Sequence, residues 1–349
     1  MGERRKEWLE EFDYFRGVCI FCIVYQHVLQ HMGIDAVLDG TGNPVYRALY
    51  VLIYQSTLLF VFISGFLFHR VFYADFNYVR FMKNKVQKIF CPYLTIATAL
   101  LIVGAAYKFF VLHTPITAKT FIHAYFYGSF WYIPFIMLVF LTAHIHLGFL
   151  KLKIKYQIPV LIFGLIVCIV LGRSNDPVYS FWGLSPFYLL GISYSQHYDF
   201  FKRLRPIAYI GILALYCVCL IFVIVDESFY FAHISHSILK NFPRYDYGPL
   251  YKILEILLAL WIFNWLKRAV GGWPKTILSI LAKYSFSIFF LHNVIFALPD
   301  FRRILPNESE HMLFGGGIAI ACLVCVICIA VAFLVKKATG KKSRMIIGA

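Results

Sequence analysis

Long apolar runs alternate with short polar segments along almost the whole chain. A helix that crosses a membrane needs about 20 predominantly apolar residues, and runs near that length recur here. The runs cover residues 15–32, 46–69, 93–112, 130–149, 157–172, 179–197, 206–225, 248–266, 276–298 and 313–335. We therefore expect an all-α, polytopic membrane bundle of about ten spanning helices.

Two segments depart from this pattern. The sixth run contains Ser185 and Pro186, and a proline in a helix interior removes one backbone hydrogen bond, so we expect an interruption there. The segment FIHAYFYGSF, residues 121–130, is too aromatic and too polar for a clean span. We expect it to lie at the membrane interface or to dip back into the membrane.

Composition supports the membrane assignment. The chain of 349 residues is 61% hydrophobic and 14% charged, whereas soluble domains are about 45–50% apolar and about 25% charged. No linker rich in Gly, Pro or Ser divides the chain, so we expect a single transmembrane domain over residues 1–349. The nine cysteines lie almost entirely inside apolar runs, which favours packing over a disulfide framework.

The basic residues predict the orientation of the bundle. Lys and Arg gather at both ends of the chain and in every second loop, whereas the intervening loops, such as 226–247, carry mixed charges. The positive-inside rule then places both termini in the cytoplasm. The net charge of +16 follows from this topology and from contact with anionic membrane lipids, so it implies no nucleic-acid partner.

The first run carries an arginine and a histidine in the stretch FRGVCIFCIVYQH, residues 15–27. Eleven residues of helix rise about 16 Å and end within about 20° of three full turns, so Arg16 and His27 share one face. Arg16 then lies at the cytoplasmic end and His27 near the middle of the membrane. Ionisable groups at that depth usually face a bundle interior or a water-filled cavity.

Each of these residues also has a purely structural interpretation. Arg16 can equally be an interface anchor whose head reaches toward water, and His27 a histidine bonded between packed helices. Asp13, one turn before Arg16, is placed to hold its guanidinium. His31 follows His27 by four positions, but no carboxylate stands beside the pair in this helix, so we expect no metal.

Five stretches resemble the motifs of one known family. FDYFRGVCIFCIVYQH resembles the first-helix signature of the integral-membrane acyltransferase-3 family, in which ten residues separate an Arg from a His. The other stretches are LLFVFISGFLF (58–68), FMKNKVQKIFCPYL (81–94), FWYIP (130–134) and LAKYSFSIFFLH (281–292). The resemblance covers nearly the whole chain, and we expect a stand-alone membrane enzyme.

The resemblance implies transfer of an acyl group, usually acetyl, to a hydroxyl of a cell-surface or secreted glycan or of a lipid-linked saccharide. The donor would be a cytoplasmic acyl-CoA, here acetyl-CoA, and the location a bacterial cell membrane. His27 would be the catalytic base, because histidine suits proton transfer near neutral pH. Arg16, about 16 Å away along the same helix face, would act together with His27 as a catalytic and donor-binding residue.

The same resemblance assigns donor binding to a basic loop. Lys85 and Lys88 stand where the family often has arginine, and we expect them to hold the phosphates of CoA. Lysine lacks the planar fork of arginine, which weakens that assignment. Positive-inside topology explains the same two charges without any ligand.

Further candidates come from the motifs and from the charges inside the runs. We expect contributions to substrate binding from Asp13, Trp131, Glu255 and His292. Glu255 lies one turn after Lys252, and the two can instead form a buried ion pair that supports the fold. His292 can instead be a helix-packing histidine. Ser64 beside Gly65 is better explained by a close approach of two helices than by a nucleophile.

A transporter or flippase of lipid-linked sugars is the rival class. Ten helices, an interrupted helix at LSPF and charges inside the membrane fit it as well. Inverted halves would distinguish it, and no pairing of short broken helices between the two halves is visible in the sequence. A non-catalytic scaffold of an export assembly is a third possibility. The pattern leaves the acyl group, the acceptor and the oligomeric state open.

Overall fold

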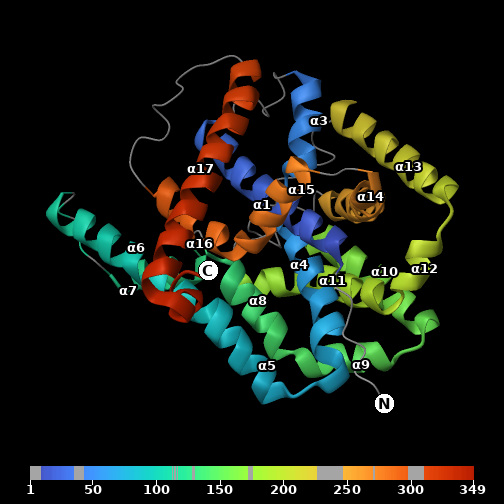
Figure 1. Cartoon of the computed structure of the whole chain (residues 1–349), viewed down its shortest axis with the longest axis horizontal. Coiled ribbons are helices and arrows are strands. Elements are labelled where there is room, and N and C mark those ends of the chain that lie inside the picture. The colour runs from blue at the N-terminus through green and yellow to red at the C-terminus, as the bar shows by residue number, and fades with distance from the viewer. Residues whose placement is uncertain are drawn as a thin grey trace.

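The protein, seen here as a computed structural model, is helical throughout its described segments (Figure 1). The structure describes residues 9–34, 43–111, 113, 115, 117–127, 130–171, 176–225, 247–269, 272–297 and 310–349. No β-strand occurs in these segments, which confirms the all-α class.

The first half of the chain begins with a long helix and continues with broken ones. Its helices are α1 (Glu10–His31), α3 (Pro44–Ile53), α4 (Thr57–Leu67), α5 (Tyr78–Lys85), α6 (Cys91–Phe110), α7 (Ala118–Ile122), α8 (Tyr132–Leu141), α9 (Ala143–Lys151) and α10 (Ile154–Leu171). Short π-helical turns follow α4, α5 and α7 at Phe68–Phe72, Val86–Phe90 and His123–Tyr127.

The second half contains the longest helix. Its helices are α11 (Pro177–Gln196), α12 (Tyr198–Arg203), α13 (Pro206–Val225), α14 (Gly248–Ala269), α15 (Trp273–Lys283), α16 (Ser285–Phe296), α17 (Glu310–Thr339) and α18 (Ser343–Ile346).

The described part of each of the ten predicted runs is largely helical, but the count of ten spans is not confirmed. In the described residues, five helices are long and apolar enough to cross a membrane, or seven if two bent pairs each count as one span. The bent pairs are α8 with α9, at 57°, and α15 with α16, at 73°. Polar residues explain part of the difference between the predicted and the observed number of spans. Helix α11, for example, contains the buried residues Ser180, Ser193 and Ser195, which lower its hydropathy. The cytoplasmic location of the termini stays a prediction, and loop residues 226–246 lie outside the described segments.

The expected interruption at Pro186 is wrong. Helix α11 continues through this proline from Pro177 to Gln196. The neighbouring helix accommodates the ring because Gly164 of α10 has no side chain; a Cβ there would lie 2.8 Å from the Cβ of Pro186. Close packing against α10 therefore compensates for the missing hydrogen bond.

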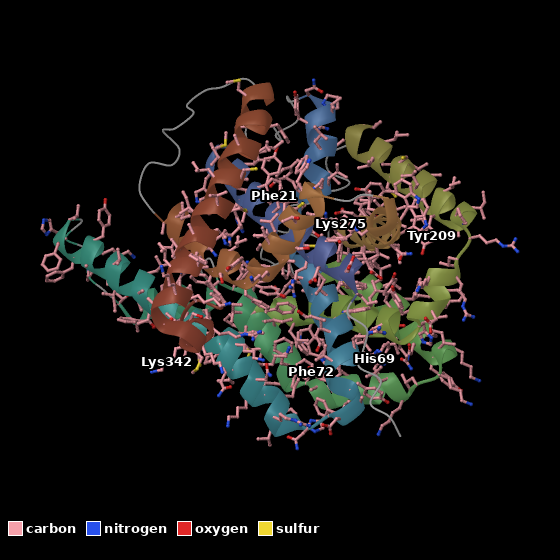
Figure 2. The ribbon with its side chains drawn as sticks, in the orientation of Figure 1. Phe21, His69, Phe72, Tyr209, Lys275 and Lys342 are labelled. Carbon is pink, nitrogen blue, oxygen red and sulfur yellow. The ribbon has the colours of Figure 1, made fainter. Side chains whose placement is uncertain are left out.

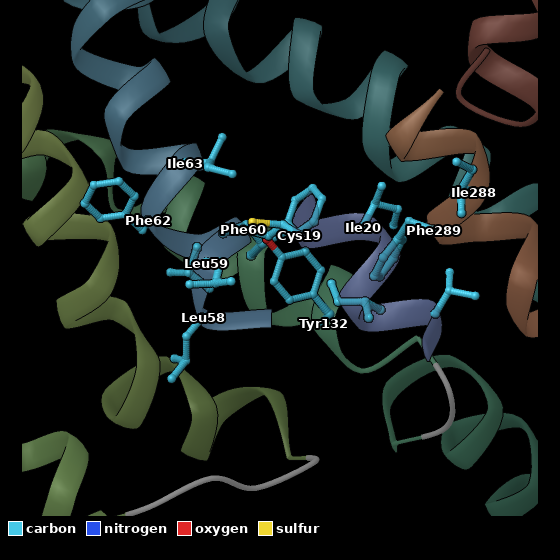
Figure 3. Packing of buried hydrophobic residues seen from close by; sticks show 14 of the residues in the cluster. Cys19, Ile20, Leu58, Leu59, Phe60, Phe62, Ile63, Tyr132, Ile288 and Phe289 are labelled. Atoms are coloured by element: carbon cyan, nitrogen blue, oxygen red, sulfur yellow. The ribbon is translucent and has the colours of Figure 1, made fainter. Parts of the chain in front are cut away.

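Helix α1 forms the centre of the bundle (Figure 1) and packs against α4, α14, α15, α16 and α17. Figure 3 shows Cys19 and Ile20 of α1 among residues of α4, with Tyr132 of α8 and Ile288 and Phe289 of α16 close by. All nine cysteines are free, as the sequence predicts, and most of them pack inside helices.

The closest helix contact joins α4 to α11. A Cβ on Gly65 would lie 1.9 Å from the backbone oxygen of Tyr188, and one on Gly191 would lie 2.0 Å from the oxygen of Phe62. Only glycine fits at such distances, so the two backbones touch directly. The prediction that Gly65 serves a close helix approach is confirmed.

Candidate active site

Arg16 and His27 occupy one unbroken helix. Helix α1 runs from Glu10 to His31 without a kink, so the eleven-residue spacing places both residues on one face, about 16 Å apart along the axis. This part of the sequence-based geometry is confirmed.

Arg16 retains an unsatisfied donor inside the protein. Its Nη2 lies 3.3 Å from Oδ1 of Asp13, and its side chain is about one-fifth exposed. The Nε–H of Arg16 is buried and has no hydrogen-bond partner. Leaving such a donor unpaired costs about 1–3 kcal/mol, so a ligand oxygen at this point would be stabilised. Asp13 holds the guanidinium as predicted; its contribution to substrate binding stays a prediction.

His27 is half-buried and oriented by a neighbour on its own helix. Its Nδ1 lies 3.1 Å from Oε1 of Gln30. This contact is within hydrogen-bond distance and orients the imidazole ring along α1. Sequence reasoning missed Gln30, although its position three residues after His27 places it on the same side of the helix.

His292 reaches His27 from a distant part of the chain. The two rings stack with centroids 5.4 Å apart and planes at 30°. His292 is fully buried, and its Nδ1 donates to the backbone oxygen of Ile288 at 2.8 Å. Its Nε2 is buried and has no hydrogen-bond partner. The structure therefore brings together two histidines that the sequence predicted separately.

The bend between α15 and α16 makes this meeting possible. Helix α15 lies directly against the first part of α1, where a Cβ on Gly17 would come within 2.4 Å of the backbone oxygen of Leu278. The 73° bend then turns α16 across the later part of α1. His292 consequently faces α1 near the level of His27.

Aromatic and imidazole rings close the site beyond the two histidines. His31 stacks on Phe296 at 4.7 Å, and its Nδ1 donates to the backbone oxygen of His27 at 2.9 Å. Phe296 also contacts the rings of His27 and His292. Across the described segments, no group of three or more His, Cys, Asp or Glu side chains is placed to hold a metal ion.

The structure does not bring Lys85 to this site. Its Nζ lies over three phenylalanine rings, 4.4 Å from the centroid of Phe140, 4.8 Å from Phe72 and 5.2 Å from Phe81. These cation–π contacts enclose the ammonium between α5, α8 and the turn after α4. Lys88, on the next π-helical turn, lies close to the charge of Arg344, whose helix α18 packs on that turn.

Glu255 and Trp131 lie close to the helices that carry the two histidines. Glu255 is within electrostatic reach of Cys19 and Cys22 of α1. The rings of Phe130 and Tyr132, on either side of Trp131, contact Phe290 and Phe289 of α16. Lys252 is fully buried and donates to Oε2 of Glu255 at 2.7 Å and to the backbone oxygen of Leu52 at 3.0 Å. This pair satisfies a carbonyl at the end of α3, so its structural interpretation is supported. The ring contacts of Trp131 include Tyr132 and Phe135 on its own segment.

Another buried histidine, His146, lies in α9, far from His27 and His292 in the sequence. The Nε2 of His146 donates to the backbone oxygen of Val139 at 2.9 Å, and its Nδ1 is buried without a hydrogen-bond partner. Its ring lies 4.7 Å from that of Tyr188 and 5.9 Å from that of Phe68. Sequence reasoning did not single out His146.

Comparison with known proteins adds one match to this geometry. Residues 9–337 match the acyltransferase-3 family, which is described as an acyltransferase domain. The match begins just before α1 and ends near the end of α17, so it includes both Arg16 and His27 and reaches past His292. No curated protein and no solved structure matches the chain.

Proposed function

This chain belongs to the acyltransferase-3 family, and on that premise we propose that it moves an acyl group from acyl-CoA to a hydroxyl of a glycan. Acetyl is the expected group, and a cell-surface, secreted or lipid-linked saccharide is the expected acceptor. The long apolar helices support a location in a membrane, and in the proposed arrangement a cytoplasmic donor and an outer acceptor approach from opposite sides.

The stacked pair of His27 and His292 carries the proposal. Acyl transfer to a hydroxyl requires a base that is neutral, oriented and accessible to substrate. His27 is oriented by its contact with Gln30 and is only half-buried, and we propose that it acts in its neutral form. His292 is sealed from solvent, so we assign it a positioning role against the His27 ring rather than contact with substrate.

The proton transfers then balance within the site. Nε2 of His27 accepts the proton as the acceptor hydroxyl oxygen bonds to the thioester carbonyl carbon. The tetrahedral intermediate collapses with cleavage of the carbon–sulfur bond, and His27 returns the proton to the thiolate of CoA. The products are an acyl ester and free CoA thiol, and the histidine is neutral again.

Arg16 serves the donor at a distance from the reacting carbon. About 16 Å of helix separates it from His27, so its guanidinium does not reach the tetrahedral intermediate. That distance suits the arm of CoA, whose thioester lies far from its phosphates. We propose that the buried, unpaired Nε–H of Arg16 binds an oxygen of the donor. Binding of the CoA phosphates by the basic loop stays a prediction. Because three aromatic rings enclose the ammonium of Lys85, we now expect this role for Lys88 alone.

Membranes that contain the protein test the function directly. Radiolabelled acetyl-CoA is supplied with the host's glycans, and both labelled ester and released CoA thiol are measured. We expect label in the glycan fraction with the wild type and almost none with His27→Ala. Release of no thiol and transfer of no label by folded wild-type protein would contradict the proposal.

Transport of a lipid-linked sugar is the second candidate function. The structure supports it more than the sequence does, because each half of the chain contains one sharply bent helix pair, at α8–α9 and α15–α16. Broken helices of this kind line substrate sites in transporters. A flippase would move a fluorescent lipid-linked sugar across proteoliposomes without any acyl-CoA, and that assay separates the two functions.

A further inference from the structure

A cluster of three cations lies where the basic turn after α5 meets helix α18. Lys88, on the π-helical turn Val86–Phe90, is within electrostatic reach of both Lys85 and Arg344. Within the described segments, neither Lys88 nor Arg344 forms an ion pair or a hydrogen bond. Like charges that are held close together cost free energy, and an anion between them offsets that cost.

Acidic side chains do not neutralise this cluster. The charge that acts on Lys88 is that of Arg344, and in the described part of the chain no Asp or Glu side chain acts on it. The acid that precedes the basic turn, Asp75, is already paired with Arg80 at 2.7 Å. The cluster therefore keeps a positive charge that attracts a phosphate group.

Lys85 adds charge to the cluster but has no free ammonium. Three phenylalanine rings enclose its Nζ, and the nearest centroid, that of Phe140, lies at 4.4 Å. Of the two lysines in the basic loop motif, Lys88 is then the one left for the several phosphate groups of CoA. Lysine also lacks the planar fork with which arginine binds two phosphate oxygens at once. Arg344 is a guanidinium of this kind, supplied from a distant part of the chain.

A closed turn carries Arg344. Helix α17 ends at Thr339, and Gly340 adopts a φ of +58°, a left-handed conformation that ends the helix. Ser343 is 1% exposed, and its hydroxyl lies within hydrogen-bond distance of the backbone oxygens of Gly340 and Ala349, at 2.7 and 2.9 Å. The backbone around Arg344 is therefore fixed, while its side chain stays exposed.

The residues after α18 anchor this turn in the bundle. Ile347 is buried and belongs to the main hydrophobic core. Gly348 lies against α16, where an added Cβ would come within 3.3 Å of Phe286 and 3.4 Å of Phe290. Helix α18 itself packs against α6 and the turn of Lys88. Lys342, labelled in Figure 2, lies immediately before α18 at this place.

Helix α16 joins this region to the histidine pair. Its first turn contains Phe286, which contacts the residues after α18, and a later turn carries His292. The helix rises about 9 Å between these two residues. The phosphates of CoA are well separated from its thioester, so a phosphate site displaced along α16 from the reacting histidines suits this donor.

We propose that Arg344 and Lys88 together bind the phosphates of the acyl-CoA donor, and that Arg344 supplies the planar fork that the basic loop lacks. The inference rests on the proposed acyl-transfer function and extends the donor site to a residue outside the loop. The headgroups of anionic lipids also carry phosphate, so the experiment separates these two sources.

A donor without phosphates tests the site. Steady-state transfer is measured in nanodiscs of phosphatidylcholine with acetyl-CoA and with S-acetyl-pantetheine, which keeps the thioester arm only. For Arg344→Gln we expect KM for acetyl-CoA to rise about tenfold with kcat nearly unchanged, because a charge-assisted hydrogen bond is lost. The kinetics with S-acetyl-pantetheine should match those of the wild type, which also shows that the variant is folded. Arg344→Lys should recover only part of the loss.

Lys341 offers a matched control on the same tail. It is exposed, and its charge is not among those that act on Lys88. Lys341→Gln removes the same charge as Arg344→Gln, so a pure topology signal would respond equally to both changes. We expect KM for acetyl-CoA to stay at the wild-type value in Lys341→Gln. Added salt should raise the wild-type KM more steeply than that of Arg344→Gln, because screening weakens the lost charge pair.

CoA binding by calorimetry distinguishes the donor from a lipid headgroup. It is measured in nanodiscs of phosphatidylcholine, with and without phosphatidylglycerol. Arg344→Gln should weaken CoA binding about tenfold in both. A lipid site would instead leave CoA binding unchanged and remove the stabilisation against thermal unfolding that phosphatidylglycerol gives to the wild type, and that result would overturn the inference.

Kinetic results can also overturn it, in two ways. An unchanged KM in Arg344→Gln, or an equal rise in Lys341→Gln, would leave the tail as a topology signal while acyl transfer stands. A wild type that uses neither thioester would remove the proposed function and this inference with it.

Discussion

His292 and His146 are alike in almost every local property, yet their surroundings differ. Each is buried, donates one ring N–H to a backbone oxygen and leaves the other ring nitrogen without a partner. The neighbour of His292 is His27, a half-buried histidine with an orienting amide. The neighbours of His146 are Tyr188 and Phe68, which belong to the core.

The comparison shows that burial and an unpaired nitrogen do not identify a functional histidine. The unpaired ring nitrogens of His292 and His146 both lower the stability of the folded protein, and the one in the core, at His146, has no functional partner. What distinguishes the α1–α16 region is a second imidazole ring that is only half-buried. The α9–α11 region is closed instead, because glycine contacts press α4 against α11 there.

The largest expected effect follows from removal of His27. His27→Ala should lower the rate of acyl transfer by about 10²–10⁴, the usual loss for a general base. The low-pH limb of the wild-type rate profile should disappear, because only neutral His27 accepts the proton. Near-normal transfer by correctly folded His27→Ala would contradict the assignment and leave His27 as a packing residue.

The paired variants His292→Ala and His146→Ala test the comparison itself. We expect His292→Ala to lower kcat by up to about 100-fold, because the His27 ring loses the surface that positions it. His146→Ala should keep kcat and instead lose about 1–3 kcal/mol of stability from its core cavity. Activity and thermal unfolding of both purified variants decide the matter. A larger kcat loss in His146→Ala than in His292→Ala would reverse our assignment of the two regions.

Arg16 should show a smaller effect on a different kinetic parameter. Arg16→Ala removes a charge-assisted hydrogen bond to the donor, so KM for acetyl-CoA should rise about tenfold or more while kcat changes less. Arg16→Lys should rescue it poorly, because lysine lacks the planar fork. Asp13→Asn serves as a milder control that loosens the guanidinium without removing it. Full rescue by lysine would make Arg16 an interface anchor.

The features that depend on local helical periodicity could be predicted from the sequence. The shared face of Arg16 and His27, the contact between Asp13 and Arg16 and the close approach at Gly65 all follow from residue type and helical spacing. The all-α class follows from the apolar runs in the same way.

Features that depend on tertiary contacts were not predictable. The hydrogen bond to Gln30 requires a particular side-chain rotamer, and the meeting of His27 with His292 requires the bend before α16. Helix α11 continues through Pro186 only because a glycine of the neighbouring helix makes room.

The smallest effect is expected at Lys85, the last residue of α5. Lys85→Met replaces an ammonium that three phenylalanine rings enclose with an apolar chain of similar length, so KM for acetyl-CoA should stay within about twofold of wild type. Lys88→Gln should behave alike if the charge of Lys88 serves membrane topology alone. Donor binding at several salt concentrations sharpens the test, because screening weakens only exposed charge pairs. The contrary outcome, which phosphate binding by Lys88 and Arg344 requires, is a KM for acetyl-CoA that rises in Lys88→Gln, and rises more as the salt concentration is lowered, while the KM for S-acetyl-pantetheine, a donor that lacks the nucleotide, does not change. That result would show that Lys88 binds the phosphates of CoA and that the basic loop is more than a topology signal.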